Sequence, residues 1–233
     1  MAEIKKGTEH TGIENVGQAF TKAELFIENN QKIITYVVIG IFVVVGGFLG
    51  FNKLYLAPLN LEAHNQMYVA EQYFQKDSFN LALNGDGNNW GFIKIIDEYG
   101  LTKAANLAHY YAGMSYYKLG KYQDAIDQLE KFKANDKLVS PIALGTIGDS
   151  YVELGNNNGK ALKYYLKAAN KSENELTSPV YLMKAGQICE ETGDYEQAVK
   201  LYKLLKEKYP VSMEGRDIDK YITRAQVMIE NKK

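Results

Sequence analysis

The hydrophobic pattern of the chain is dominated by one long apolar run, from Ile33 to Phe51. Its sequence, IITYVVIGIFVVVGGFLGF, holds 19 residues and no charge. As a helix it would be about 28 Å long, close to the ~30 Å thickness of the hydrocarbon core of a bilayer. Lys32 and Lys53 bracket it. The pattern predicts a single transmembrane helix over residues 32–55.

Two other interpretations of this run fit it less well. A buried core helix rarely extends this far without a polar residue. A cleaved signal peptide starts near the N-terminus with a short apolar region and ends in small residues at a cleavage site. Here about thirty residues precede the run, and Asn52-Lys53-Leu54-Tyr55 follows it. The prediction is therefore a retained membrane helix.

Lysines flank the apolar run unevenly, which predicts its orientation. The positive-inside rule places the lysine-rich side in the cytoplasm and gives acidic residues little weight. The tail, residues 1–31, is therefore expected in the cytoplasm. The domain 56–233 is then expected beyond the membrane, which for a bacterial inner (plasma) membrane means the periplasm; the opposite placement is the alternative. The lysines before the run are Lys5, Lys6, Lys22 and Lys32.

Two further features of the N-terminal region concern helix contacts. Gly46 and Gly50 form a GxxxG pair, a spacing that lets a second membrane helix approach closely, although glycine is common in such helices and chance also explains the pair. In the tail, apolar residues recur at helical spacing: Val16, Phe20, Ala23 and Ile27. They predict a short amphipathic helix that lies on the inner membrane face or contacts a partner.

Beyond residue 100 the pattern of small and large residues repeats. Three segments align when their glycines are superposed: 106–137, 141–172 and 179–210. Each has a glycine in its first half, a second glycine seven residues later in a turn, then an alanine, and a large residue four positions after it. In that order these are Gly113, Gly148 and Gly186; Gly120, Gly155 and Gly193; Ala125, Ala161 and Ala198; and Leu129, Tyr165 and Tyr202.

This pattern resembles the tetratricopeptide repeat (TPR), a helix-turn-helix of about 34 residues. The first glycine lets the second helix approach the first, and the alanine occupies the tight crossing of the pair. A degenerate pair is expected over 61–99, and a capping helix over 217–229. Within the pair, one periodic segment extends from Leu61 to Leu83, with these residues on one side: Met67, Ala70, Phe74 and Leu81. The predicted fold class is all-α, a transmembrane helix followed by a TPR-type α-solenoid with a C-terminal capping helix.

The composition of the chain excludes some classes of function but does not indicate a particular one. The 27 basic and 28 acidic residues nearly cancel, whereas a nucleic-acid binder would carry a basic stripe. The single cysteine, Cys189, rules out an intramolecular disulfide. The 18 tyrosines suit both packed helices and binding grooves, because each has a broad apolar ring and one polar tip.

Candidate chemistry is sparse. The three histidines, His10, His64 and His109, lack metal-ligand spacing, and Cys189 follows Gly186 by one turn, a packed core position. The loop 85–89, GDGNN, lacks the bidentate acid of an EF-hand loop, so an ordinary turn is expected. The sequence therefore predicts no catalytic residue, no metal site and no cofactor, and an enzyme is not expected.

Protein binding is the remaining function, and the TPR resemblance implies where it occurs. In that family the first helix of each unit lines a concave groove. The residues that this resemblance places in the groove are Tyr110, Met114, Tyr117, Lys118, Asp149, Glu153, Met183, Gln187 and Glu190. Tyrosine and methionine would give adaptable apolar contact, and the acids would hold a basic or amide-rich segment. Packing between adjacent repeats is the alternative role for the same side chains.

The whole layout is similar to that of the YfgM family of bacterial inner-membrane proteins. In that family an aromatic-Glu-Asn segment followed by lysine leads into the anchor, as Phe26-Ile27-Glu28-Asn29-Asn30-Gln31-Lys32 does here. The resemblance implies an ancillary subunit of the SecYEG protein-export channel whose repeats bind emerging clients or a PpiD-like periplasmic chaperone. A scaffold for another envelope assembly, such as outer-membrane protein biogenesis or division, is the alternative.

Overall fold

The computed structural model describes residues 24–155 and 157–232. The chain divides into two units, Met1–Ala57 and Pro58–Lys233. Regular structure in the described residues is helical, apart from one antiparallel bridge between Gly85 and Trp90.

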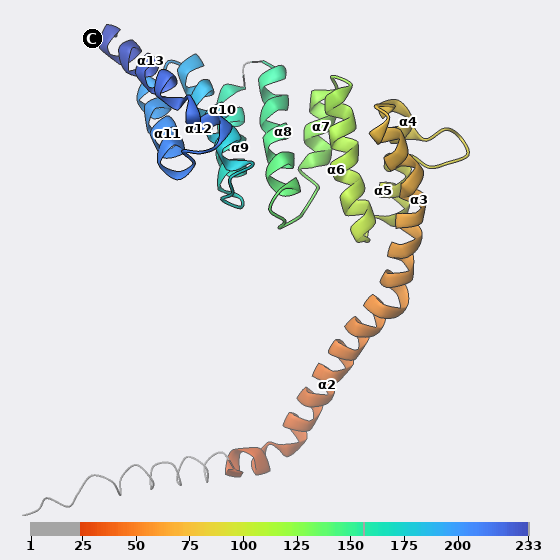
Figure 1. Cartoon of the computed structure of the whole chain (residues 1–233). Helices are drawn as coiled ribbons and strands as arrows, with labels where there is room; N and C mark the ends of the chain where they lie inside the picture. Colours follow the sequence, from red (N-terminus) through yellow and green to blue (C-terminus); the bar gives the residue numbers. More distant parts are fainter. Residues whose placement is uncertain (1–23, 156, 233) are drawn as a thin grey trace, which may run out of the picture. The chain divides into compact units, whose positions relative to one another are not determined.

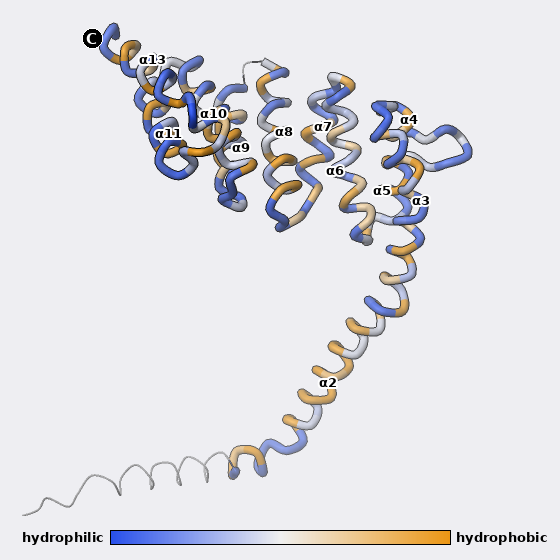
Figure 2. The backbone as a smooth tube through the Cα atoms, viewed as in Figure 1, coloured by the Kyte–Doolittle hydropathy of each residue, from blue (hydrophilic) through white to orange (hydrophobic). Residues whose placement is uncertain are grey.

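The first unit contains α2, Gln31–Gly50, which holds most of the apolar run. None of its residues is buried, and beyond its polar first two residues it is mostly apolar, orange to pale in Figure 2. Among the described residues, the continuous helical stretch that begins with α2 is the one long enough and apolar enough to cross a membrane. A helix suits that environment because its backbone N–H and C=O groups bond to each other and need no water.

Two predictions for the first unit concern contacts with other molecules. A Cβ added at Gly46 or Gly50 would meet no atom within 4 Å, so a second helix against this face remains a prediction. Most of the predicted amphipathic helix, including Val16, Phe20 and Ala23, lies outside the described residues. Residues 24–29 are helical, and Ile27 is exposed.

The helical backbone continues past the apolar run. A wider π-helical turn, η1, Phe51–Leu56, joins α2 to α3, Ala57–Gln75. Pro58 accounts for the wider turn, because proline has no N–H and its ring clashes with the carbonyl four residues earlier in a regular α-helix. Just before it, the Ala57 N–H donates to the Asn52 carbonyl, five residues back. Sequence reasoning, which starts the next helix near residue 61, misses this continuity.

The single periodic segment expected over 61–83 contains two helices. α3 ends at Gln75, and α4, Phe79–Asn84, follows a turn in which Asp77 has a φ of 56°, in the left-handed region. Met67 and Ala70 are buried as expected, but Leu81 is 40% exposed. The break turns α4 away from the helical register of α3, so the expectation for Leu81 is wrong.

The next helix, α5, Phe92–Tyr99, completes an N-terminal group. Its Phe92 and Ile95 are fully buried in a cluster with residues of α3, α4 and the start of the first repeat. The Phe92 ring stacks on Tyr111, with centroids 5.2 Å apart. Three helices, rather than the expected pair, therefore precede the repeats.

Three helix pairs, followed by two C-terminal helices, make up the rest of the second unit, and the pairs lie side by side in Figure 1. The first helix of each pair is at least as long as the second. Among the second helices, α7 is markedly short. The pairs are α6, Lys103–Lys118, with α7, Tyr122–Leu129; α8, Val139–Glu153, with α9, Asn158–Asn170; and α10, Ser178–Glu191, with α11, Tyr195–Lys208.

The repeated glycines lie where the two helices of each pair cross. A Cβ added at each would fall inside the large residue of the partner helix, at these distances: Gly113 to Leu129 Cγ, 2.5 Å; Gly148 to Tyr165 Cε1, 2.6 Å; Gly186 to Tyr202 Cε1, 2.2 Å. The repeated alanines are all fully buried: Ala125, Ala161 and Ala198. The small–large pattern in the sequence is therefore a pattern of close helix crossings.

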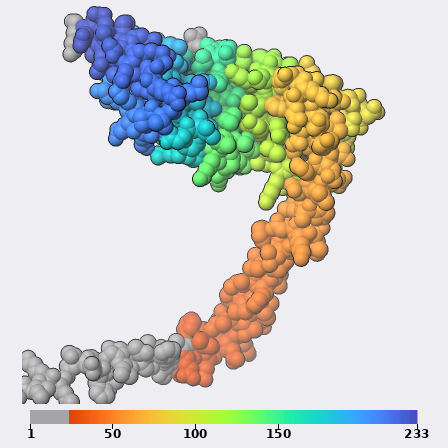
Figure 3. All heavy atoms as spheres, in the orientation of Figure 1, coloured from red at the N-terminus to blue at the C-terminus, as the bar shows by residue number. Residues whose placement is uncertain are grey.

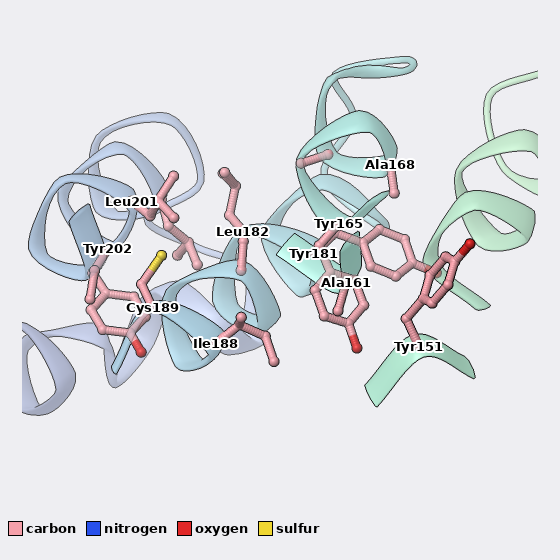
Figure 4. Packing of buried hydrophobic residues seen from close by; sticks show 14 of the residues in the cluster. Tyr151, Ala161, Tyr165, Ala168, Tyr181, Leu182, Ile188, Cys189, Leu201 and Tyr202 are labelled. Atoms are coloured by element: carbon pink, nitrogen blue, oxygen red, sulfur yellow. The ribbon is translucent and has the colours of Figure 1, made fainter. Parts of the chain in front are cut away.

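A second buried cluster runs from Ile126 through all later repeats and into the C-terminal helix. After the short α12, Met213–Arg216, the last helix, α13, Ile218–Asn231, buries Ile218, Ile222 and Ala225 against it. In Figure 4, Cys189 lies beside Tyr202 within this cluster. Figure 3 shows side chains filling the spaces between the ribbons of the repeats on the face in view.

Candidate functional site

The first surface is the one that the sequence predicts, on the first helices of the pairs. On α6, Tyr110 and Met114 are half-buried against the repeat core, and Tyr110 contacts the ring of Phe132, with centroids 5.4 Å apart. Burial raises the pKa of Tyr117, and the negative charge of the nearby Asp149 raises it further. Lys118 is exposed at the end of the helix.

Asp149 on α8 lies at the junction of the second and third repeats. Its Oδ1 accepts hydrogen bonds from the Tyr165 hydroxyl at 2.7 Å and from Lys184 Nζ at 2.6 Å. Lys184 also lies over the rings of Tyr165 and Tyr181, 5.6 and 6.0 Å from their centroids. Burial and the Asp149 charge raise the pKa of both tyrosines, so both hydroxyls are neutral at pH 7.

Glu190 on α10 has the same role at the C-terminal end. Its carboxylate accepts from the Tyr202 hydroxyl at 3.1 Å and from two nitrogens of Arg224 on α13, with the Nε contact at 3.1 Å. Its side chain is only 12% exposed. A planar guanidinium matches a carboxylate well, so this pair joins the last repeat to the capping helix.

The remaining predicted residues surround these two junctions. Glu153 is exposed at the end of α8. Partial burial raises the pKa of Tyr122, and the charge of Glu153 raises it further. Gln187 is half-buried on α10. Met183, also half-buried, lines a pocket of about 210 Å³ with Met213 and Tyr221 among others.

The structure brings Tyr117, Asp149 and Glu153 together and places Glu190 at a separate junction. Two of the three predicted acids are already bonded to a cation, Asp149 to one of the next repeat and Glu190 to one of the capping helix. Lys184 and Arg224, which complete those pairs, were not singled out from the sequence, because each is about 35 residues from its partner and no local spacing signals the contact. A ligand-binding role for the nine residues stays a prediction.

A second surface, formed by α9 and by Leu144 of α8, was not predicted. A groove of about 680 Å³ runs along α9, with Leu144, Leu162 and Leu166 as its apolar floor and Lys163 and Lys167 at its rim. The other lining residues are Gly159, Asn170 and Lys171. An apolar floor with a cationic rim is suited to an apolar peptide segment that carries acidic residues.

The groove continues into a smaller pocket beside the first repeat. This pocket, of about 350 Å³, shares Leu144 and Lys171 with the groove and adds Phe132 and Ala143. α7 ends at Leu129, and the irregular segment after it supplies one wall. The sequence carries one signal for the groove, the spacing of Leu162 and Leu166 beside Lys163 and Lys167 on one helix.

Other reactive groups in the described part of the chain offer no alternative site. His109 Nδ1 lies 2.8 Å from Gln128 Oε1, and burial lowers its pKa. Burial raises the pKa of the Cys189 thiol to about 11, which opposes thiolate formation. Within residues 24–155 and 157–232, no three His, Cys, Asp or Glu side chains gather as a metal site requires.

Comparison with known proteins agrees with this architecture. A tetratricopeptide-repeat family model matches residues 107–137 and 181–212. Two crystal structures of nearly identical TPR-like repeats, from a Podosopora anserina protein described as a kinesin light chain, superpose with a TM-score of 0.54 at 12% sequence identity. Each alignment covers 75% of this chain and 88% or 89% of the other. The comparison with curated protein sequences gives no match.

At that identity the superposition establishes the fold alone. Together with the family match, it confirms the predicted class: the chain is an all-α, TPR-like repeat protein with a long apolar N-terminal helix. Repeats of this type are scaffolds for protein–protein interaction and are typically non-enzymatic.

Proposed function

We propose that this chain is a membrane-anchored protein-interaction module and an ancillary subunit of the bacterial Sec protein-export channel. The observation that carries the proposal is the union, in one chain, of an apolar helix without a buried residue and a repeat unit with an open apolar groove. The helix supplies a tether, and the groove supplies a binding surface. The similarity of the anchor segment 26–32 to the YfgM family supports the assignment to the export channel.

Tethering explains why a shallow groove suffices. A module held at the membrane meets partners in the same membrane at an effective concentration set by the tether rather than by diffusion, so weak binding becomes useful. We place the repeat unit in the periplasm, as the lysine distribution favours. There it would meet chains that leave the export channel and the chaperones that receive them.

The groove residues indicate what kind of segment binds. Lys163 and Lys167 flank an apolar floor, and no ion pair within the described residues involves either side chain. A segment with apolar side chains and nearby acids would satisfy both features. We therefore assign the groove to such a segment of an emerging client or of a PpiD-like chaperone.

The first test is purification of the full-length chain from membranes in mild detergent, followed by identification of the proteins that accompany it. We expect subunits of the Sec channel and a periplasmic chaperone. Reproducible recovery of partners without any channel subunit would refute the Sec assignment, whereas recovery of cytoplasmic proteins alone would refute the periplasmic placement.

The groove is tested by a matched pair of charge reversals. Lys163 and Lys200 are both exposed, and each lies two residues after the repeated alanine of its pair, but only Lys163 lines the groove. Lys163→Glu should reduce recovery of the chaperone or client severalfold, and Lys200→Glu should leave it unchanged. Equal recovery with both variants would show that the groove does not hold the partner.

A further inference from the structure

The outward face of α9 carries two adjacent rows of side chains. Successive helix residues turn by about 100°, so Leu162 and Leu166 form one row, and Lys163, Lys167 and Lys171 form the row beside it. The backbone of Lys171, just after the helix, is still helical, so the lysine row continues through it. All five side chains line the groove of about 680 Å³. The cationic rim of the groove therefore lies along one side of its apolar floor.

α9 differs in charge from the second helices of the other pairs. It holds three lysines and no acidic residue, whereas α7 holds two acids and no basic residue, and α11 holds four lysines with two acids. Within the described residues, no ion pair involves Lys163, Lys167 or Lys171. The uncompensated positive charge is therefore a feature of the middle repeat and not of the repeat pattern.

Most acids of the neighbouring connections are bonded to other groups. The connection before α8 and the connection after α9 hold four acidic residues. Asp136 accepts from backbone N–H groups at the start of α8, and Glu173 accepts from Lys208 at 3.1 Å. Glu130 accepts from the hydroxyl of Tyr164. The lysine row of α9 is therefore available to the acids of a partner.

The two adjacent rows select the shape of that partner. A β-strand points successive side chains to opposite faces, so it presents a single row to the groove. A helix presents two adjacent rows, because residues three or four positions apart form one row and their neighbours in sequence form the next. Acids at every fourth position of a helix are about 6 Å apart along its axis, and so are the lysines of α9. A helix also bonds its own backbone groups and brings no unpaired N–H or C=O to the apolar floor.

We propose that the groove of α9 binds an amphipathic helix in which acidic residues, four positions apart, form a row beside the apolar row. The inference rests on the proposed function, in which the groove is a binding surface, and it names the structure of the segment that binds. The groove extends along α9 from Gly159 to Lys171, about 18 Å, which matches about three turns of the bound helix. Of the two partners proposed above, a folded chaperone presents such a helix, whereas an extended emerging chain does not.

The test uses three peptides of about 14 residues, slightly longer than the groove. The first has leucines in one helical row and glutamates in the rows on both sides of it. The second has the same residues, with the glutamates moved to the opposite face of the helix. The third is the first with proline at its centre, which breaks the helix. Each carries fluorescein and is titrated, by fluorescence anisotropy, with the full-length chain in nanodiscs of phosphatidylcholine and phosphatidylglycerol, and with empty nanodiscs.

Two matched double charge reversals identify the surface that the peptides bind. Lys163→Glu with Lys167→Glu reverses the lysine row of α9. Lys200→Glu with Lys203→Glu makes the same change in charge at exposed positions of α11 that do not line the groove. A fourth peptide, with lysine in place of each glutamate of the first, is titrated with the parent chain and with the α9 variant.

We expect the first peptide to bind the parent chain about tenfold more tightly than the second or the third. The α9 variant should lose about tenfold in affinity for the first peptide and the α11 variant less than about twofold, and salt should reduce the difference because it screens exposed charges. The fourth peptide should bind the α9 variant more tightly than it binds the parent chain. That exchange of preference also shows that the variant is folded.

Equal affinity for the first and second peptides, equal losses in the two variants, or no binding of the first peptide would overturn the acidic helix. If the third peptide binds as tightly as the first, the groove takes an extended segment and the helical form is wrong. These outcomes are separate from the Sec assignment. A chain that recovers channel subunits but does not distinguish the peptides keeps that assignment and loses the acidic helix, and the reverse result does the opposite.

Discussion

Replacing Gly186 by alanine is the sharpest test of the proposed helix crossings. The new Cβ would lie 2.2 Å from Tyr202 Cε1 and within 2.8 Å of two further ring atoms. Tyr202 is fully buried, and its hydroxyl donates to Glu190. The ring cannot move aside without giving up that bond, so α10 and α11 must separate.

The magnitude follows from two opposing effects. In an open helix, glycine to alanine stabilises by about 0.5–1 kcal/mol, because glycine loses more backbone freedom on folding. Forcing an extra carbon into a packed core costs about 1–3 kcal/mol. We therefore expect Gly186→Ala to lower the free energy of unfolding by about 1–2 kcal/mol, which for a domain of this size lowers Tm by about 2–8 °C.

Gly159→Ala is the matched control. Gly159 is in the first turn of α9, is exposed, and has nothing within 4 Å of an added Cβ. The same substitution there should raise Tm by about 1–4 °C. Both variants are compared with the parent chain by thermal unfolding in mild detergent, followed by circular dichroism. If Gly186→Ala stabilises the chain as Gly159→Ala does, the close crossing of α10 and α11 is wrong.

Three further predictions concern the buried polar groups and the thiol. Cys189, with its raised pKa and full burial, should react with a thiol reagent at pH 8 at least tenfold more slowly in the native chain than in urea; equal rates would contradict its packing. Folding raises the pKa values of Tyr165 and Tyr202, so their contribution to stability is complete below about pH 10 and falls above it. The urea midpoint of unfolding should therefore drop from pH 9 to pH 11, and in the folded chain the absorbance change of tyrosine ionisation should occur at a higher pH than in the unfolded chain. Lys184→Met should cost about 1 kcal/mol in the same urea assay by leaving Asp149 without its half-buried cation, and Asp149→Asn in that background should restore part of it; no loss in the single variant would mean that the pair is not formed.

The sequence predicts the helix pairs well because their signal is local. Gly113, Gly148 and Gly186 and the large residues opposite them are separated by only 16 or 17 positions, within one helix-turn-helix. The same reasoning misses Gly145, where a Cβ would lie 2.0 Å from Tyr181 Cε1. That contact joins two repeats, so it has no counterpart in the internal pattern of a single unit.

The first helices and the surfaces were harder to predict. The break at Asp77 is a single left-handed residue within a periodic segment, and periodicity does not report it. The pairing of Glu190 with Arg224 depends on how α13 packs on α10. The smaller pocket beside the groove depends on the early end of α7 at Leu129, because the irregular segment after it supplies one wall.

The central claim is that the helix from Gln31 to Gly50 remains in the mature chain and holds the repeats at the membrane. Alkaline carbonate extraction of cell membranes, followed by the intact mass of the retained chain, tests it most directly. We predict that the chain stays in the membrane pellet with residues 33–51 present, and that Ile41→Lys with Val44→Lys, at about 2.5–3.5 kcal/mol for each charge at the helix centre, releases it. Release of the unaltered chain by carbonate, or a mass that lacks residues 33–51, would contradict the account.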